Sequence, residues 1–258
     1  MKRFSLFLAA AFALLASCTQ EFRTETFEFD RQIPFHEGSD FYDGLSYTVE
    51  YPVAGFSKAA LKQMRSEIFK ACLGEAYANF DGTLEEMAAD IAKVHTEEYV
   101  TANQNLLKEL EIEEDEANNL NWESMVSGSF GEEYDKYINY QYSIYEYYGG
   151  AHGMNYDGAL VLDKKTGKAV TYDTFTKGVS REGLMELLDE YKMDNLVKEI
   201  EYDLKPEDVF YAETIEPSDK FRVGEEGITF YYDPYDLAPY VFGGIEITIP
   251  WEALEKKK

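Results

Sequence analysis

Residues 134–148 carry the side-chain pattern that most narrows the fold, because polar and apolar residues alternate there with a period of two. That period places one set of side chains on each face of a β-strand. The core face is expected to be aromatic and aliphatic, with polar positions between: Ile138, Tyr140, Tyr142 and Ile144 alternate with Asn139, Gln141 and Ser143. The 21 Tyr and 17 Phe of the 258-residue chain also favour sheet, where aromatic side chains pack well.

Further strands are indicated by short runs of β-forming residues. We expect 120–131 to pair with 134–148 through a polar turn at 131–133. The last strand has the clearest pattern, since Ile245, Ile247, Ile249 and Trp251 point one way. The other expected strands cover 47–53, 155–162, 221–223 and 228–232.

Helices are expected where a capping residue precedes apolar positions at helical spacing. Thr83 and Glu86 form a capping box at the start of a helix that runs to about Glu111. The helices before and after it are expected to be capped by Ser57 and Ser180, the latter with a continuation at 196–200. Helices among antiparallel strands predict an α+β chain.

The first 18 residues have the anatomy of a secretory signal, with two basic residues ahead of an apolar run too short to span a membrane. The string Leu15–Cys18 resembles the lipobox of bacterial lipoproteins, which implies that the signal peptide 1–17 is removed and that Cys18 is lipidated. An ordinary secretory signal with an incidental Cys is the alternative. We expect a lipid-anchored protein of the cell envelope. Thr19, rather than Asp, after the Cys favours the outer membrane, on its periplasmic or surface face.

Acidic residues outnumber basic ones two to one, with 50 Asp and Glu against 24 Lys and Arg and a formal net charge of -26. Removal of residues 1–17 takes away Lys2 and Arg3 and no acidic residue, so the expected mature chain carries -28. Nucleic acid is excluded as a partner because no stripe of Lys and Arg is present to displace counterions. The charge favours a basic partner, which it would steer at low salt.

No cofactor or metal is expected. The acidic run Glu113–Glu116 lacks the Gly and the alternating oxygen ligands of a calcium loop, so we interpret it as solvated. Cys72 is expected to be buried and inert on the apolar face of the first helix. The sequence contains no P-loop, dinucleotide-binding glycine motif, paired metal-binding histidines or nucleophile elbow.

Glycines gather around His152, which makes this string a candidate ligand-binding segment. The candidate residues are Tyr148, Gly149, Gly150, His152 and Gly153, because glycines let a backbone approach a ligand and tyrosines supply amphipathic contact area. Two alternatives remain open. His152 could order a strand-to-strand turn through local hydrogen bonds, or it could act as a general base.

Residues 231–240 form a second candidate segment that leads into the last strand. Two prolines are expected to order this loop, and Tyr235 and Tyr240 are candidate ligand-binding residues. Asp233 and Asp236 could bind calcium, but no third ligand converges with them in the sequence, so a structural loop is the expectation.

Four strings are together similar to the RsiV/PdaC-type family of bacterial envelope domains, the domain of unknown function numbered 3298, which is usually preceded by a partner domain numbered 4163. The strings are Tyr148–Gly153, Leu162–Lys168, Phe230–Tyr240 and Ile245–Pro250. The resemblance implies an α+β fold of two intertwined subdomains of antiparallel sheet packed by helices. It divides the mature chain into a lipidated tether at 18–40 and subdomains at 41–132 and 133–258.

In the best-known relatives this module binds lysozyme within an anti-sigma factor or precedes the catalytic domain of a peptidoglycan deacetylase. The sequence matches neither the sigma-binding segment nor the metal-binding motifs of the deacetylase, so the resemblance implies the shared, non-catalytic module. We expect a non-enzymatic lipoprotein that binds a protein, such as lysozyme, or a peptidoglycan fragment. The alternatives are a glycan-active hydrolase with two carboxyls about 5–9.5 Å apart, an accessory module of a peptidoglycan-modifying system, and a purely structural envelope component.

Overall fold

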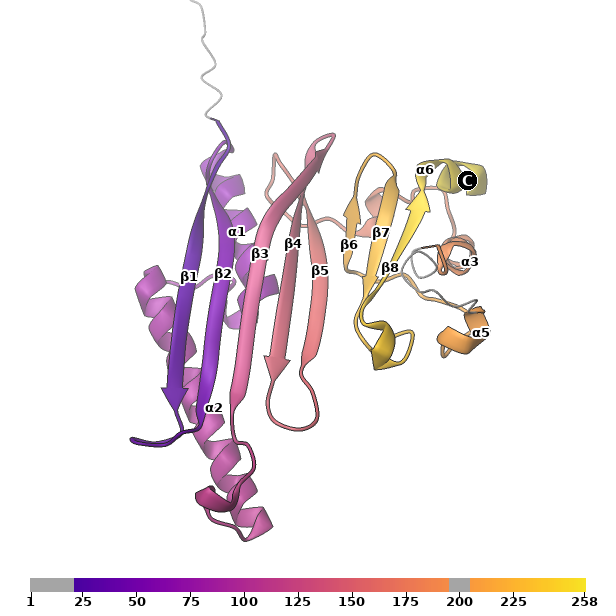
Figure 1. Ribbon diagram of the computed structural model, residues 1–258. Helices are drawn as coiled ribbons and strands as arrows, with labels where there is room; N and C mark the ends of the chain where they lie inside the picture. Colours follow the sequence, from indigo (N-terminus) through magenta and orange to yellow (C-terminus); the bar gives the residue numbers. More distant parts are fainter. Residues whose placement is uncertain (1–20, 195–204) are drawn as a thin grey trace, which may run out of the picture.

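Two β-sheets form the frame of the molecule, whose computed structural model describes residues 21–194 and 205–258. The larger sheet has five strands in the order of the chain (Figure 1): β1 (Arg23–Pro34), β2 (Tyr42–Ala54), β3 (Trp122–Tyr134), β4 (Tyr137–Tyr147) and β5 (Met154–Asp163). The smaller sheet has three strands: β6 (Phe221–Val223), β7 (Gly227–Tyr232) and β8 (Ile245–Pro250). The predicted α+β class is therefore confirmed.

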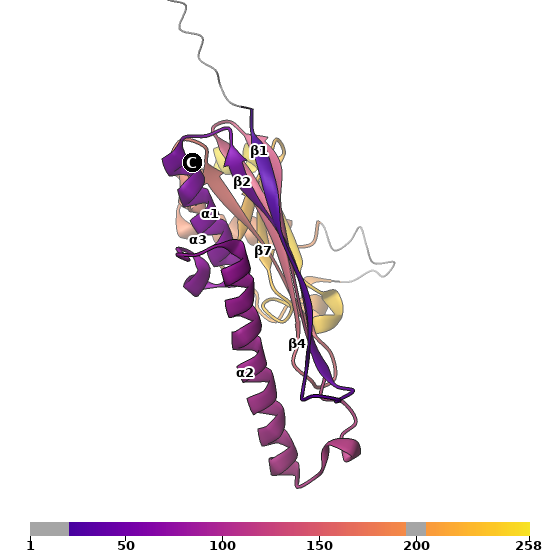
Figure 2. The ribbon, with the colours of Figure 1, turned by 90° about the vertical axis from the view of Figure 1, so that its left-hand side faces the viewer.

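The helices cover one face of each sheet. Figure 2 shows α1 (Lys58–Leu73) and the long α2 (Leu84–Leu110) on the same side of the larger sheet, and α3 (Arg181–Tyr191) and α6 (Trp251–Lys257) pack on the smaller sheet. A single turn of helix, α5 (Pro206–Val209), follows the undescribed residues. The predicted caps are confirmed, since the side chains of Ser57, Thr83 and Ser180 each accept a hydrogen bond from a first-turn amide. The predicted helical continuation at 196–200 lies outside the described residues.

One strand pair corrects the expectation of purely antiparallel sheets, because β2 and β3 run parallel. The connection between them contains both α1 and α2, and such a crossover is what returns a chain to the end at which a parallel strand begins. All other strand pairs are antiparallel.

The expected tether at 18–40 is wrong from Arg23 to Pro34, because these residues form β1 and pair with β2 along their whole length. Phe27 and Ile33 are buried, while charged and polar residues fill most of the positions between them. Charged side chains are common on edge strands, where they discourage pairing with other molecules, and here they concealed the alternation.

The expected turn at 131–133 is also wrong, because β3 continues to Tyr134 and the chain turns at Asp135 and Lys136. Asp135 has a φ of 52°, in the left-handed region that such a turn requires. The expected subdomain boundary between residues 132 and 133 therefore falls inside β3, and the two sheets are joined instead by the segment after β5. Trp251 is a third correction, since it begins α6 and donates its indole N–H to the Gly224 carbonyl at 2.9 Å.

Each sheet has its own apolar core against its helices. In the larger core, Met64 and Ile68 of α1 meet Val49 and Tyr140 of the sheet, and all four are essentially inaccessible to solvent. Cys72 belongs to this core, where burial raises the pKa of its thiol to about 12, so the prediction of a buried Cys is confirmed. The smaller core also takes in Tyr137 and Val161 from β4 and β5, so the two sheets share residues at their junction.

Asn139 joins the two sheets with its side-chain amide. The amide nitrogen donates to the carbonyls of Val223 and Glu132, each at 2.7 Å, and the amide oxygen accepts from the Val223 N–H at 3.0 Å. Asn139 is 3% exposed, so these bonds form away from water. The Asn139 side chain thus takes the place of a neighbouring strand's backbone at the edge of β6. The sequence pattern had placed Asn139 on the face of β4 opposite the core.

Asn139→Ala is expected to lower the free energy of unfolding by at least about 2 kcal/mol, because two buried backbone groups of Val223 and the part-buried Glu132 carbonyl lose a hydrogen-bond partner. Urea denaturation of the variant measures this loss. Gln141→Ala is the matched control, since Gln141 is exposed and makes one bond across the same junction, to Tyr231 at 3.2 Å. An equal loss of stability in the two variants would contradict the role assigned to Asn139.

Candidate functional site

An open groove lies between the two sheets, on the face of the larger sheet that α1 and α2 leave uncovered. Its volume is about 410 Å³. The register of the strands aligns four of its residues in one row: Thr48 of β2, Ser127 of β3, Ser143 of β4 and Asp157 of β5. Neighbouring strands are about 4.8 Å apart, so the row presents three hydroxyls and a carboxylate at regular intervals. Within residues 21–194 and 205–258, none of these four side chains has a hydrogen-bond partner.

The smaller sheet supplies the opposite wall of the groove, with Tyr231 of β7 and Glu246 of β8. The hydroxyl of Tyr231 accepts bonds from the Arg222 Nε at 2.8 Å and from the Gln141 amide at 3.2 Å. Arg222 also approaches the Glu246 carboxylate, at 3.7 Å. Burial raises the pKa of Tyr231, so its hydroxyl stays protonated in the physiological range. The contacts of Arg222 hold this wall together within the smaller sheet, and the bond from Gln141 ties it to the larger sheet.

Three aromatic rings stack on one another in the segments that precede β5 and β8. The ring of His152 lies on the ring of Tyr240, with centroids 4.1 Å apart and planes inclined by 22°. Tyr235 flanks both, with its ring centroid 5.6 Å from that of Tyr240 and 6.5 Å from that of His152. The segments of His152 and Tyr240 lead directly into β5 and β8, which carry Asp157 and Glu246. The structure therefore brings three of the candidate residues together just before β5, although none of the three lines the groove.

Local hydrogen bonds orient this stack. His152 Nδ1 donates to the Gly153 carbonyl at 3.0 Å, and the Tyr240 hydroxyl donates to the same oxygen at 2.9 Å. A Cβ at Gly153 would approach the ring of Tyr145 to 2.4 Å, so any larger residue there would displace that ring. Gly149 and Gly150 have φ values of 92° and 93°, which few other residues adopt. Gly149 and Gly150 thus shape the turn that precedes His152.

Tyr148 belongs to a different part of the molecule. Its ring packs on Trp122, with centroids 4.7 Å apart, and its hydroxyl donates to Glu146 at 2.9 Å. Trp122 in turn packs against Tyr99 of α2, so Tyr148 lies on the helix-covered side of the sheet. The sequence string placed it with His152, but the turn through Gly149 and Gly150 separates them.

The loop at 233–240 has the structural character that was expected. Asp233 forms an ion pair with Lys220 at 2.5 Å, and Asp236 accepts a hydrogen bond from the Asp233 N–H at 2.9 Å. Tyr235 has a φ of 74°, which turns the loop and exposes its ring. One oxygen of each carboxylate is thus bonded, to Lys220 before β6 or to the loop backbone, while Asp233 Oδ1 is buried without a partner among the described residues.

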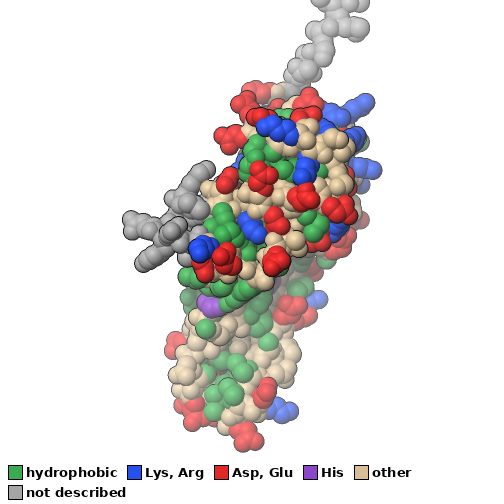
Figure 3. Space-filling model, turned by 90° about the vertical axis from the view of Figure 1, so that its right-hand side faces the viewer, with side chains coloured by type: hydrophobic (Ala, Val, Ile, Leu, Met, Phe, Trp, Pro, Cys, Tyr) green, Lys and Arg blue, Asp and Glu red, His purple; other side chains and the backbone are tan. Residues whose placement is uncertain are grey.

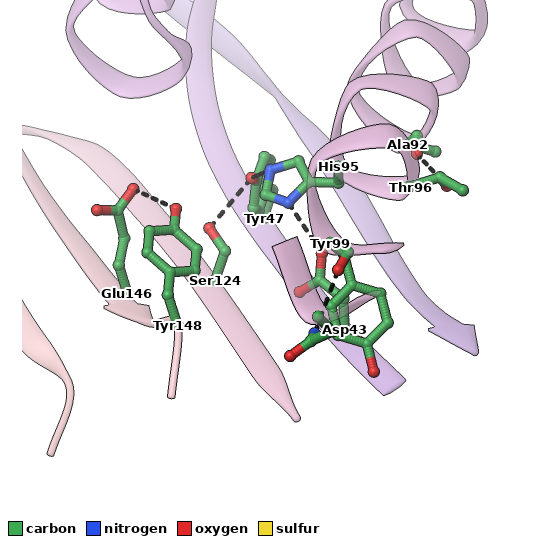
Figure 4. A network of polar contacts seen from close by, with 10 residues as sticks. Asp43, Tyr47, Ala92, His95, Thr96, Tyr99, Ser124, Glu146 and Tyr148 are labelled. Atoms are coloured by element: carbon green, nitrogen blue, oxygen red, sulfur yellow. Dashed lines mark hydrogen bonds and ion pairs between the residues drawn. The ribbon is translucent and has the colours of Figure 1, made fainter. Parts of the chain in front are cut away.

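A second polar cluster, which the sequence did not indicate, lies between α2 and the larger sheet. Figure 4 shows His95 of α2 between Asp43 and Tyr47 of β2. His95 Nδ1 donates to Asp43 Oδ2 at 3.0 Å, while Nε2 lies 3.0 Å from the Tyr47 hydroxyl, which is 3.2 Å from Ser124 Oγ. Asp43 is fully buried, and its Oδ1 has no partner among the described residues.

The order carboxylate, imidazole, hydroxyl in this cluster resembles that of a nucleophilic triad. Its hydroxyls are not activated, however, because burial raises the pKa of Tyr47 to about 12 and Ser124 is 2% exposed. A cavity of about 320 Å³ adjoins the cluster and is lined in part by Cys72, whose thiol is also held protonated. The arrangement fastens α2 to the sheet. Its members are too far apart in sequence for spacing to have revealed it.

The acidic run Glu113–Glu116 is used in local structure. Glu114 accepts a bond from Ser39 at 2.5 Å and pairs with His36, and the Glu116 carboxylate accepts from the Glu113 N–H. In the part of the chain that the structure describes, no three His, Cys, Asp or Glu side chains are grouped to hold a metal ion. No helix of that part is long and apolar enough to cross a bilayer.

Comparison with known proteins bears on the segment that carries the smaller sheet. Residues 173–252 match the family described as "Protein of unknown function (DUF3298)". The matched region begins after β5 and ends just inside α6, so it contains the wall of the groove formed by β7 and β8. No curated protein matches the chain.

Two solved structures of DUF3298 family proteins are similar over almost the whole chain. The one from Bacteroides fragilis NCTC 9343 is 23% identical, with a TM-score of 0.78 over 93% of this chain and 94% of that one. The one from Pseudomonas aeruginosa PAO1 is 16% identical, with a TM-score of 0.60 over 91% and 93%. These likenesses show that the fold, including the larger sheet, is shared with DUF3298 proteins.

His95→Ala is expected to lower the free energy of unfolding by about 3–5 kcal/mol, because it leaves the buried Asp43 carboxylate without its partner. Urea denaturation measures the loss. The double variant Asp43→Asn and His95→Ala removes the buried charge, so it is expected to recover part of the lost free energy of unfolding. If the free energy of unfolding of His95→Ala lay within about 0.5 kcal/mol of that of the parent chain, the role of His95 in fastening α2 to the sheet would be contradicted.

Proposed function

We propose that this protein is a non-enzymatic binding module of the bacterial cell envelope, and that its ligand, a cell-wall glycan fragment, lies in the groove between the two sheets. The observation that carries the proposal is the row Thr48, Ser127, Ser143 and Asp157, four polar side chains that converge in one groove without partners in the described chain. These side chains are exposed or half-buried, so in the free protein they bind water, which a ligand can displace.

The chemistry of the groove suits a sugar chain. Hydroxyls and a carboxylate can exchange hydrogen bonds with sugar hydroxyls and acetamido groups, and a strand spacing of about 4.8 Å offers a contact at each step across the sheet. The stack of His152, Tyr235 and Tyr240 lies just before β5, the strand that carries Asp157, and offers ring faces to a ligand that extends beyond the groove. Aromatic faces of this kind add apolar contact area at low rotamer cost.

The surroundings of the histidines support binding rather than catalysis. His152 donates to a backbone carbonyl and stacks on tyrosines, and His95 is enclosed between Asp43 and Tyr47. The alternative of a glycan-active hydrolase is favoured by one observation, the presence of the Asp157 and Glu246 carboxylates in the same groove. The binding experiment below separates the two.

Lipidation at Cys18 would hold the module at a membrane. The lipobox-like string supports this, and β1 begins five residues after Cys18, so the folded part would lie close to the bilayer.

The mature charge of -28 also favours a second candidate partner, a basic protein such as lysozyme. Figure 3 shows acidic side chains spread over much of the end that carries the smaller sheet, together with fewer basic ones.

Cys18→Ser is expected to release the protein from the membrane fraction of the native cell, because the acyl chains contribute about 0.8 kcal/mol for each buried methylene. Fractionation followed by immunoblotting measures the distribution. Cys72→Ala, which changes the other Cys, is expected to leave the protein with the membrane. Wild-type protein found in the soluble fraction would contradict the anchor.

Ser127→Ala combined with Asp157→Asn is expected to weaken binding of a soluble peptidoglycan glycan fragment at least about tenfold, as measured by calorimetry, because a hydrogen bond to a charged group contributes about 1.5–3 kcal/mol. Ser46→Ala is the control, because Ser46 lies on β2 next to the row but does not line the groove.

Three results would contradict the proposal. The fragment could fail to bind, or it could be cleaved in a reaction that Asp157→Asn abolishes, as the hydrolase alternative requires. The protein could also bind lysozyme at low salt with an affinity that the groove variants leave unchanged, which would favour the basic protein partner.

A further inference from the structure

A larger cavity lies on the other side of the molecule, between α1, the loop at 75–83 and the start of α2. Its volume is about 930 Å³, within the range of small-molecule sites. The larger sheet separates it from the groove, since α1 and α2 cover the face opposite the row of hydroxyls (Figure 2). Nothing in the proposed function uses this cavity.

Three cations line one wall. Lys58, Lys62 and Arg65 are spaced four and three residues apart, so these three side chains share one face of α1. The chain has twice as many acidic as basic residues, yet none of these three forms an ion pair with a residue in the described ranges. One carboxylate, that of Asp81, also lines the cavity. Three unpaired cations on one helix face of so acidic a chain mark a place suited to a small anion.

Arg65 is held in position for such a role. Its Nε donates to the Pro52 carbonyl at 2.9 Å, and its guanidinium lies over the ring of Tyr51, 5.2 Å from the centroid. Tyr51 is itself fixed, because its hydroxyl donates to Glu25 at 2.9 Å. These contacts leave the terminal nitrogens of Arg65 without a partner among the residues described, and a planar guanidinium oriented in this way suits a carboxylate or phosphate.

The floor of the cavity is apolar. Phe69, Tyr77 and Met87 are buried there, and Phe80 and Leu84 stand at its edge. The hydroxyl of Tyr77 donates to Asp90 at 3.1 Å, so the polar end of that ring is satisfied. An apolar floor beneath a cationic wall matches a ligand that has an apolar body and an anionic head.

We propose that this cavity binds a single-chain anionic amphiphile, an acyl chain that ends in a carboxylate or a phosphate. The acyl chain lies on Phe69 and Met87, and the head group is bound by Lys62 and Arg65. Charge complementarity selects this ligand over a neutral lipid of the same length. The site is independent of the groove, so either proposal stands without the other.

The test uses the chain from residue 18 onward with Cys18→Ser, which keeps every described residue. Decanoate and decyl phosphate are the anionic probes and decanol is the neutral one, with binding measured by calorimetry. Lys62→Gln combined with Arg65→Gln is expected to weaken binding of the anionic probes at least about tenfold and to leave decanol unchanged. The tighter of the two anions identifies the head group.

Lys108→Gln is the matched control, because Lys108 is exposed near the far end of α2 and its loss changes the net charge in the same direction. Lys62→Glu is a second variant that avoids the contacts of Arg65 and is expected to weaken the anions at least as much as Lys62→Gln alone. Three results would each overturn the proposal. Neither anion could bind at about 1 mM, decanol and decanoate could bind with equal affinity, or Lys108→Gln could weaken anion binding as much as the double variant does.

Discussion

The side-chain amide of Asn139 determines how the two sheets meet, and the groove depends on that meeting. Two buried hydrogen bonds to the backbone of Val223 connect the start of β4 to the edge of β6, and a third, to the Glu132 carbonyl, ties the same amide to β3. Buried amides with every polar atom satisfied specify one geometry, because any sliding of the sheets would leave polar groups unpaired away from water. The wall formed by Tyr231 and Glu246 thereby stands beside the row of hydroxyls on the larger sheet.

The larger sheet presents two chemically different faces, because successive side chains along each strand point to opposite sides. The face toward α1 and α2 is apolar and holds the network around His95, while the opposite face carries small hydroxyl side chains that add little to a core. Small polar residues such as Ser127 and Ser143 leave room for a ligand between the sheets.

Local signals in the sequence predicted the elements well. The caps at Ser57 and Thr83 and the alternation in β4 depend on neighbours within a few residues, so they could be identified directly. The long edge strand β1 was missed because its charged positions interrupt the pattern, and the parallel pairing of β2 with β3 depends on a connection that contains two helices. His152, Tyr235 and Tyr240 were identified, but the row from Thr48 to Asp157 comes from four strands whose register only the fold supplies.

The account rests on the groove between the sheets as the place where a ligand binds. The most direct measurement is a map of backbone amide chemical shifts in the isotopically labelled protein as a soluble cell-wall glycan fragment is added. The account predicts saturable shifts centred on Ser127, Ser143, Asp157 and Tyr231, with smaller ones at His152. Shifts confined to the opposite face around α1, or none at all, would contradict it.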